Sequence, residues 1–280
     1  MSRRPEWLRK KVSFKAKRDT DELLKDVGIA TICQEAMCPN ISECFGKKQA
    51  TFLILGSVCT RACTFCNVTR GKPEDIDYKE IEKVVEAIKR LELKNVVITS
   101  VTRDDLSDGG AKHFFECVKA IKEFDKDIKI ELLIPDFNED RNSIEIVSNS
   151  GAQIVGHNIE TIKRRYDIRN GSDYERSLRV LKMIKESNPR VNTKSGIMLG
   201  LGESEEEVVE VFEDLLSVEC RFLSIGQYLA PSKKHTPVVE YIKPEQFERY
   251  KNIALDLGFR FVHSSPYTRS SYMAHEYLNV

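Results

Sequence analysis

Hydrophobic and polar residues follow one another in a pattern that predicts repeated strand–helix units from residue 51 onward. Short apolar runs such as Asn95–Ser100 and Phe222–Leu229 have the length and composition of buried strands. Between the runs, apolar residues recur three or four positions apart, as in Val208, Phe212 and Leu215, which is typical of a helix with one buried face. The predicted strands are 51–55, 95–100, 128–134, 153–157, 191–199 and 222–229, and the predicted helices are 78–92, 110–124, 140–149, 173–187, 204–217 and 244–256.

Six consecutive strand–helix units indicate a parallel sheet with its helices on the outside. A complete eight-unit barrel would need a longer chain. We therefore expect an α/β fold, a partial (β/α)6 barrel, over residues 51–262, with a short strand at 259–262. The N-terminal extension of residues 1–50 and the C-terminal tail of residues 263–280 are expected to cover the barrel mouth.

Composition and charge exclude some classes of partner. The chain has 280 residues, with 44 Lys plus Arg and 44 Asp plus Glu. This balance gives no overall attraction to nucleic acid or anionic lipid, so we expect no nucleic-acid or membrane partner. No apolar run approaches the roughly 20 residues that a membrane span needs. The basic N-terminal segment lacks the apolar core of a secretory signal, which favours a cytoplasmic protein, with a short transit peptide as the alternative.

The unusual segments of the chain follow the predicted strands. Cys59–Cys66 comes after the first strand, Asp104–Gly110 after the second, Asn158–Glu160 after the fourth and Gly200–Glu203 after the fifth. In parallel α/β folds the chemistry is found in the loops after the carboxyl ends of the strands. These loops therefore predict one functional site on a single rim of the barrel.

The first cysteine set, Cys59, Cys63 and Cys66, has the spacing C-x3-C-x2-C. A tight loop of this kind can direct three thiolates at one face of a four-iron cluster and leave the fourth iron open to a small molecule. Structural zinc is the alternative, but it prefers four protein ligands, usually as two C-x2-C pairs. The spacing favours the cluster.

The second cysteine set, Cys33, Cys38 and Cys44, has the spacing C-x4-C-x5-C and precedes the barrel. Without a secretory signal these thiols are expected to be reduced, so metal binding is favoured over disulfides. A second cluster short of one protein ligand is the main interpretation, and a three-ligand zinc site or plain buried cysteines are the alternatives. Of the two remaining cysteines, Cys117 is expected in the core, and Cys220 is expected to be a core or surface thiol and not a ligand.

With Phe65 as its aromatic residue, the first set resembles the C-x3-C-x-Φ-C signature of radical S-adenosylmethionine (SAM) enzymes. The resemblance implies a 4Fe–4S cluster whose open iron chelates SAM, and an electron that cleaves SAM to a deoxyadenosyl radical. The protein would bind and orient the cofactor and would exclude water from the site. Each glycine pair taken alone favours a simple turn, but the position of both pairs on the same rim favours a cofactor contact. The cofactor contacts that the resemblance implies are Phe65, Asp108, Gly109, Gly110, Asn158, Gly200, Gly202 and Glu203.

Over nearly its whole length the chain is similar to the lipoyl synthases. The segments that carry this similarity include Glu35–Gly46, which holds two cysteines of the second set, Thr193–Glu203 and Arg269–Tyr272. One departure is Ser264-Ser-Pro266, where the family usually has Ser-Gly-Pro, and it puts the local backbone path in question. Further matching segments are Pro5–Leu8, Val97–Ser100, Arg103–Leu106 and Gly226–Leu229.

The similarity implies two 4Fe–4S clusters and a sulfurtransferase reaction. Ser271, in the Arg-Ser-Ser-Tyr motif, would be the fourth ligand of the second cluster, and a serine oxygen binds iron more weakly than a thiolate. Radicals derived from SAM would take hydrogen from two carbons of an octanoyl chain on a lysine of a lipoyl-carrier protein domain. The second cluster would supply both sulfur atoms, and an electron donor and an iron–sulfur carrier would be further partners.

Two other readings compete with this one. The first is another radical enzyme, such as a methylthiotransferase or a biotin-type sulfurtransferase, and the second is an electron carrier or zinc-binding module. Neither accounts for three cysteines before the barrel together with a serine-bearing tail. His157 is expected to have a hydrogen-bonding role rather than a catalytic one, and the sequence assigns no role to His235 or Arg269.

Overall fold

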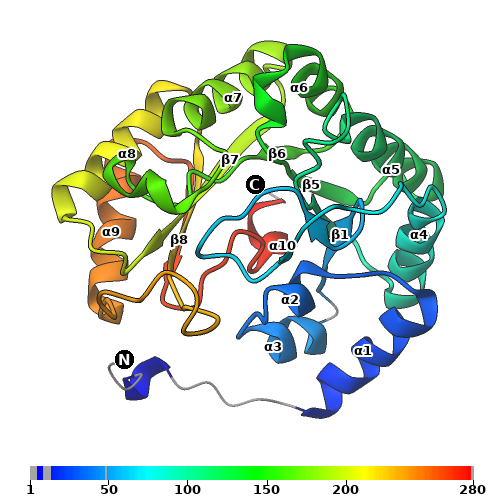
Figure 1. Ribbon diagram of the computed structural model, residues 1–280, viewed down its shortest axis with the longest axis horizontal. Helices are drawn as coiled ribbons and strands as arrows, with labels where there is room; N and C mark the ends of the chain where they lie inside the picture. Colours follow the sequence, from blue (N-terminus) through cyan, green and yellow to red (C-terminus); the bar gives the residue numbers. More distant parts are fainter. Residues whose placement is uncertain (1–4, 9–13, 48, 279–280) are drawn as a thin grey trace.

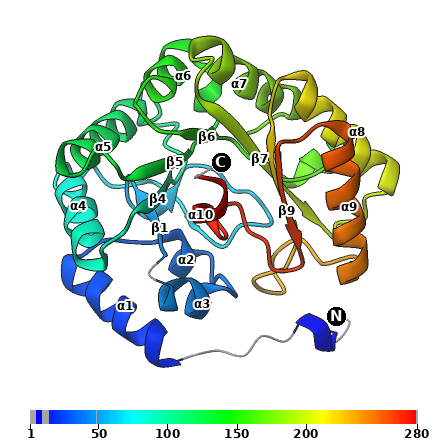
Figure 2. The ribbon, with the colours of Figure 1, turned by 180° about the vertical axis from the view of Figure 1, so that it is seen from behind.

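Seven parallel strands form one curved sheet with helices on its outer face (Figures 1 and 2). The structure is a computed structural model that describes residues 5–8, 14–47 and 49–278. Neighbouring strands follow the order β1-β4-β5-β6-β7-β8-β9, so each strand pairs with the next one of the sheet along the chain. The strands of this sheet are β1 (Thr51–Ile54), β4 (Asn95–Ser100), β5 (Lys129–Leu133), β6 (Ile154–Gly156), β7 (Asn192–Leu199), β8 (Phe222–Gln227) and β9 (Phe261–Ser265).

The predicted α/β partial barrel is confirmed. Each of the six predicted strands and helices of the barrel is present within a few residues of its expected bounds. The short strand expected at 259–262 is β9, which continues to Ser265 and pairs with β8. The outer helices are α4 (Glu80–Leu91), α5 (Ala111–Phe124), α6 (Arg141–Ser148), α7 (Tyr174–Ser187), α8 (Glu205–Ser217) and α9 (Pro244–Leu257).

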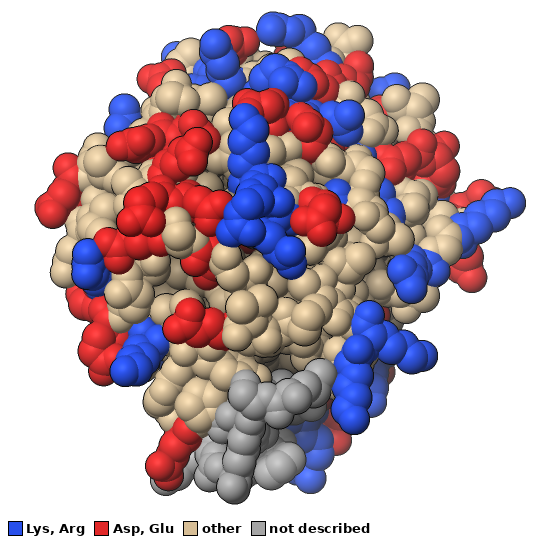
Figure 3. Space-filling model, turned by 60° about the vertical axis from the view of Figure 1, so that its left-hand side comes forward, with Lys and Arg blue, Asp and Glu red and all other residues tan. Residues whose placement is uncertain are grey.

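The outer helices each bury one apolar face against the sheet. Phe114 on α5, Leu181 on α7 and Phe212 on α8 are fully buried, and each such side chain contributes about 1.5–3 kcal/mol of transfer free energy. Their polar faces carry both signs of charge, and acidic and basic side chains both occur across the face in Figure 3. Among the described residues, no helix is both long and apolar enough to cross a membrane.

The N-terminal extension packs beside β1 (Figure 1). Its helices are α1 (Phe14–Val27), α2 (Ile32–Glu35) and α3 (Ile41–Gly46), preceded by the 3-10 turn η1 (Glu6–Leu8). The backbone N–H of Leu53 donates to the carbonyl of Ala30 at 3.0 Å, which fixes the extension to the first strand. Short elements in the loops are β2 (Val58–Cys59), β3 (Thr69–Arg70), η2 (Phe137–Glu139) and η3 (Lys163–Ile168).

The C-terminal tail runs through the barrel interior instead of only covering the mouth. Its helix α10 (Ala274–Tyr277) lies inside the ring of strands in both ribbon views (Figures 1 and 2). Because its apolar contacts lie near the amino ends of the strands, α10 closes the barrel at the end opposite the functional loops. The buried cluster around it consists of Val97, Ile154, Phe222, Ala274, Tyr277 and Leu278.

At the start of α5, the loop after β4 packs tightly against the turn after β1, and substitution of one glycine tests this contact. Gly110 has φ +91°, and a Cβ added there would lie 2.2 Å from Cδ1 of the buried Leu55. Gly151 has a similar φ of +97° with no atom within 4 Å. We expect Gly151→Ala to lower the free energy of unfolding by about 1–2 kcal/mol through backbone strain alone. Gly110→Ala should lower the free energy of unfolding by about 1–3 kcal/mol more, because the added methyl group overpacks against Leu55.

Urea unfolding of the protein without cofactors measures both variants. Equal losses for Gly110→Ala and Gly151→Ala would contradict the close contact between Gly110 and Leu55.

Candidate functional site

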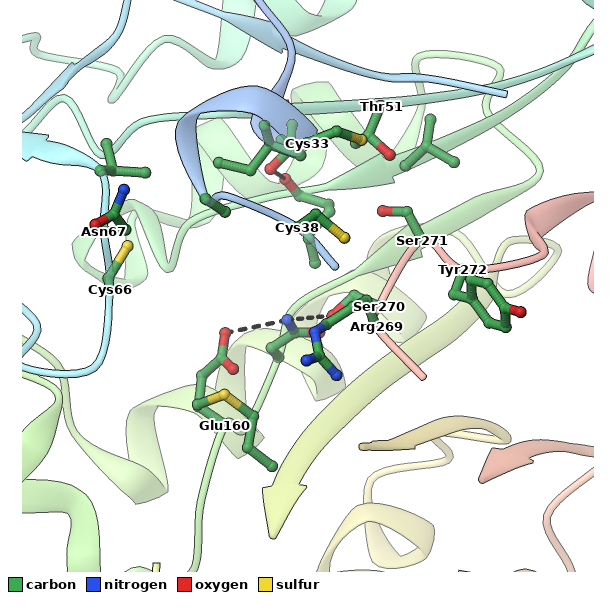
Figure 4. Close-up of a pocket in the computed structure, with 18 of the residues that line it drawn as sticks. Cys33, Cys38, Thr51, Cys66, Asn67, Glu160, Arg269, Ser270, Ser271 and Tyr272 are labelled. Atoms are coloured by element: carbon green, nitrogen blue, oxygen red, sulfur yellow. Dashed lines mark hydrogen bonds between the residues drawn. The ribbon is translucent and has the colours of Figure 1, made fainter. Parts of the chain in front are cut away.

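One cavity of about 600 Å³ occupies the barrel interior and brings together three distant parts of the chain. Its lining comes from the N-terminal extension, the loops at the carboxyl ends of the strands and the C-terminal tail, and it is mainly apolar. In Figure 4 the Ser271 side chain points toward the segment that carries Cys33 and Cys38, and Cys66 lies on another wall. The predicted site residues that line the cavity are Cys33, Cys38, Cys44, Cys59, Cys63, Phe65, Cys66, Asn158 and Ser271.

The loop that carries the first cysteine set is fixed by hydrogen bonds from its backbone to several other segments. Cys59 ends β2, and its carbonyl accepts from the N–H of Gly71 at 3.0 Å. The N–H of Thr64 donates to the carbonyl of Ile168 at 2.8 Å. These bonds fix the backbone of the loop and thereby the directions in which the three thiols point. Two further bonds run from Asn170 Nδ2 to the Ala62 carbonyl and from the Thr236 N–H to the Thr64 carbonyl.

His235, which the sequence left without a role, supports the last cysteine of this loop. Its Nε2 lies 3.2 Å from the carbonyl oxygen of Cys66, and its Nδ1 lies 2.9 Å from the hydroxyl of Ser232. The carbonyl can only accept, so Nε2 carries the proton and Nδ1 accepts from the serine. His235 therefore holds the Cys66 peptide to the loop after β8.

A buried ion network around Arg61 was not foreseen from the sequence. The guanidinium donates to both carboxylate oxygens of Asp136, at 2.8 and 2.7 Å, and to Asp104 at 2.8 and 2.9 Å. Burial disfavours the charged form of Asp136, but the hydrogen bonds and charge of Arg61 outweigh it and hold the pKa of Asp136 well below its usual range. Arg61 lies between Cys59 and Cys63, so this network fixes the middle of the first cysteine loop to the loops after β4 and β5.

Burial raises the pKa of the thiols that face the cavity. The pKa of Cys33 is raised to about 11, that of Cys63 to about 12 and that of Cys66 to about 11, in each case chiefly by burial. The positive charge of Arg169 opposes this shift at Cys63. Since a metal-bound thiol is deprotonated, metal binding at these positions releases protons.

The second cysteine set surrounds the turn between α2 and α3. Cys33, Cys38 and Cys44 are half-buried and form no disulfide. The N–H of Cys38 donates to the carbonyl of Cys33 at 3.0 Å, which brings these two residues onto one turn. In the described part of the chain, no three His, Cys, Asp or Glu side chains are grouped closely enough to hold a single metal ion.

Two side-chain amides connect the second cysteine set to the rest of the cavity wall. Asn67 Nδ2 donates to the carbonyl of Glu35 at 2.7 Å and so joins the two cysteine segments. Asn40 Nδ2 donates to the carbonyl of Tyr267 at 2.6 Å and joins the second segment to the C-terminal tail. These bonds place the two thiol sets and the tail around one space.

The side chain of the half-buried Arg269 binds a backbone carbonyl in the turn before Ser271. Arg269 donates to the carbonyl of Thr268 at 2.6 Å. Burial lowers the pKa of Arg269, and the neighbouring Cys38 opposes that shift. Arg269 therefore brings a positive charge close to one thiol of the second set.

Six of the predicted cofactor contacts do not line the cavity of the described chain. Asp108 instead accepts hydrogen bonds from the N–H groups of Gly110 and Lys112, at 2.9 and 3.1 Å, and so caps α5. Glu203 accepts from the N–H groups of Gly200 and Leu201. The observed contacts are those of turns, and a cofactor contact stays a prediction for Asp108, Gly109, Gly110, Gly200, Gly202 and Glu203.

Three residues that the sequence placed outside the chemistry are indeed structural. His157 is fully buried, and its Nδ1 donates to the carbonyl of Ile134 at 2.9 Å. Burial and the charge of Arg169 lower the pKa of His157 to about 3, so the ring is neutral. Cys117 and Cys220 lie in the core.

Comparison with known proteins adds family relationships to this geometry. Residues 53–215 match the Radical SAM superfamily. The lipoyl synthase of Geobacter metallireducens is 56% identical over 275 residues, covering 98% of this chain and 97% of the relative. The lipoyl synthase of Caldicellulosiruptor saccharolyticus is 54% identical over 279 residues, with 98% and 97% coverage.

Solved structures agree on the fold. Methylornithine synthase superposes with a TM-score of 0.56 at 14% identity, covering 91% of this chain and 79% of that one. Streptococcus suis SuiB bound to its precursor peptide gives a TM-score of 0.58 at 14% identity, with 88% and 52% coverage. At such low identity these likenesses support the barrel architecture alone.

The Arg61 network gives a prediction on stability. In Arg61→Gln the buried Asp136 loses its main positive partner, and we expect the free energy of unfolding to fall by about 3–5 kcal/mol. Arg179→Gln is the matched control, because its partner Glu139 is partly exposed and the pair contributes at most about 1 kcal/mol. Urea unfolding of the protein without cofactors measures both.

A double variant separates the charge effect from loss of packing. Arg61→Gln/Asp136→Asn leaves no uncompensated carboxylate and should be less destabilised than Arg61→Gln alone. Similar losses in Arg61→Gln and Arg179→Gln would show that the network does not hold the loop.

Proposed function

The chain belongs to the lipoyl synthases of the radical SAM superfamily, and on that basis we propose in detail how it inserts two sulfur atoms into an octanoyl chain. The octanoyl chain is carried on a lysine of a lipoyl-carrier protein domain. The observation that carries the proposal is the single cavity that both cysteine sets and Ser271 line. Radical formation and sulfur donation need to share one space, because a carbon radical must meet its sulfur before it meets water.

The cofactors are SAM and 4Fe–4S clusters, and we propose two clusters. The six clustered cysteines form no disulfide and are divided into two sets of three, each of which fits a four-iron cluster with one iron left for another ligand. When bound, SAM and the first cluster supply the radical that activates an unreactive C–H bond, and the second cluster supplies sulfur. Cys59, Cys63 and Cys66 would hold the first cluster.

We propose that Ser271 completes the second set, with Cys33, Cys38 and Cys44. Its hydroxyl points toward the segment of Cys33 and Cys38 in Figure 4, which supports this assignment. An oxygen is a harder and weaker ligand for iron than a thiolate. Ser271 would therefore be the most weakly bound protein ligand of the second cluster.

Two half-buried arginines place positive charge beside thiols of the cavity. Arg169 opposes the burial effect on the pKa of Cys63, and Arg269 stands beside Cys38. Guanidinium groups stay charged when buried, and they stabilise a thiolate more in an apolar cavity than they would in water. The largely apolar lining excludes water from the radical and accommodates an alkyl chain.

The chain is divided according to these tasks. We assign residues 1–50 to the extension that carries the second cysteine set, residues 51–262 to the radical SAM barrel and residues 263–280 to the tail with the Arg-Ser-Ser-Tyr motif. The proposal also includes a cytoplasmic location, an electron donor and an iron–sulfur carrier. It requires the last of these because each turnover removes sulfur from the protein.

Separate alanine variants of the two cysteine sets test the proposal. Cys38→Ala should keep reductive cleavage of SAM but stop sulfur transfer, because the radical site stays intact and the sulfur donor is lost. Cys63→Ala should stop both. Anaerobic incubation with an octanoylated carrier peptide measures deoxyadenosine by chromatography and the mass gain of two sulfurs by mass spectrometry.

Cys117→Ala is the control, since this buried thiol faces the core and not the cavity. Lipoylated peptide formed by Cys38→Ala would end the proposal that the second cysteine set supplies the sulfur.

A further inference from the structure

A buried ion pair crosses the barrel interior beneath the cavity. Lys194 on β7 and Glu131 on β5 are almost completely buried, and the ammonium nitrogen lies 2.8 Å from Oε1 of Glu131. Tyr277 on α10 joins them, since its hydroxyl accepts from Lys194 at 2.6 Å and donates to Oε2 of Glu131 at 2.6 Å. Each charge in this group is thus both paired and hydrogen-bonded.

The third partner of the ammonium is the main chain of the tail. Lys194 Nζ donates to the carbonyl of Ser270, and the Tyr277 hydroxyl lies 3.3 Å from the same oxygen. The side chain of Ser270 is also held, because its Oγ accepts from Asn158 Nδ2 at 2.6 Å (Figure 4). The residue before Ser271 is therefore fixed to the barrel at both its carbonyl and its hydroxyl.

Stability alone is a poor reason for such a group. A buried ion pair costs desolvation that its attraction often only offsets, and apolar residues of similar volume can replace one without loss. What an apolar group cannot do is bind a backbone carbonyl at one defined place. Lys194, with Glu131 and Tyr277 as its partners, defines that place for the carbonyl of Ser270.

We propose that Lys194 is a positioning residue for the second cluster. Held by Glu131 and Tyr277, it binds the carbonyl of Ser270 and thereby sets the position of the Ser271 hydroxyl relative to Cys33 and Cys38. This inference rests on the proposed role of Ser271 as a ligand. It adds three barrel and tail residues, distant in sequence from the cysteines, to the apparatus that holds the sulfur donor.

Two variants disturb the anchor without leaving a lone buried charge. Lys194→Met/Glu131→Gln removes it by taking away both charges. Tyr277→Phe weakens it by removing the hydroxyl that holds Lys194, and it serves if the double variant fails to fold. The matched control is Lys163→Met/Glu175→Gln, which removes an ion pair exposed at the surface. Ser271→Ala provides the reference for loss of the ligand itself.

The first measurement compares sulfur insertion with deoxyadenosine formation in the enzyme loaded with both clusters. We expect the sulfur inserted per deoxyadenosine to fall by about tenfold in the anchor variants, with deoxyadenosine formation within about twofold of wild type, because a small misplacement near reacting groups is costly. The surface control should keep the wild-type ratio.

The second measurement does not depend on activity. In full-length protein with Cys59, Cys63 and Cys66 changed to Ala, only the second cluster binds, and ⁵⁷Fe Mössbauer spectroscopy reports its serine-bound iron. The anchor variants should move this signal toward that of Ser271→Ala. A wild-type spectrum and ratio in both anchor variants would overturn the inference and leave these residues with a purely structural role.

The reference variant keeps the two proposals separate. If Ser271→Ala changes the spectrum and the anchor variants do not, the positioning role of Lys194 falls and the proposed function stands. If Ser271→Ala itself leaves the spectrum unchanged, Ser271 is not the ligand, and the positioning role falls with it.

Discussion

The structure depends on one constraint: two sets of thiols must face the same apolar cavity. Burial raises the pKa of Cys33, Cys63 and Cys66, so the free protein holds neutral thiols there, and metal binding must displace their protons. The charge of the half-buried Arg169 opposes this cost at Cys63, and the half-buried Arg269 lies beside Cys38. The site is therefore arranged for clusters and not for free thiols.

The parallel barrel meets this constraint because its two ends carry different parts of the site. The loops at the carboxyl ends of the strands carry the first cysteine set, and Arg61 and His235 fix that loop to its neighbours. The tail closes the opposite end with α10 and brings Ser271 back to the second cysteine set. The two cysteine sets, to which we assign radical generation and sulfur donation, are thus held by separate segments around one space.

Much of the barrel could be predicted from the sequence, because apolar runs and helical spacing report local burial. The cysteine spacings predicted two sets of three cysteines at one site, and both sets line one cavity, while their role as ligands stays a prediction. The short helices α2 and α3 were missed, since four and six residues are too few to show a period. The path of the tail through the barrel was missed as well, because it depends on contacts of Tyr277 with Glu131, 146 residues away. Only a weak pattern in the sequence indicated the Arg61 network. An arginine lies between two of the predicted cysteine ligands, and aspartates follow two of the strands.

The central claim, that both clusters share one cavity, is tested most directly by electron paramagnetic resonance of the reduced protein. Two paramagnetic clusters on opposite walls of one cavity couple magnetically. The spectrum of the protein with both clusters should therefore be broader than the sum of the spectra of two variants that each keep one cysteine set. A spectrum equal to that sum would show that the clusters do not share the cavity and would contradict the account.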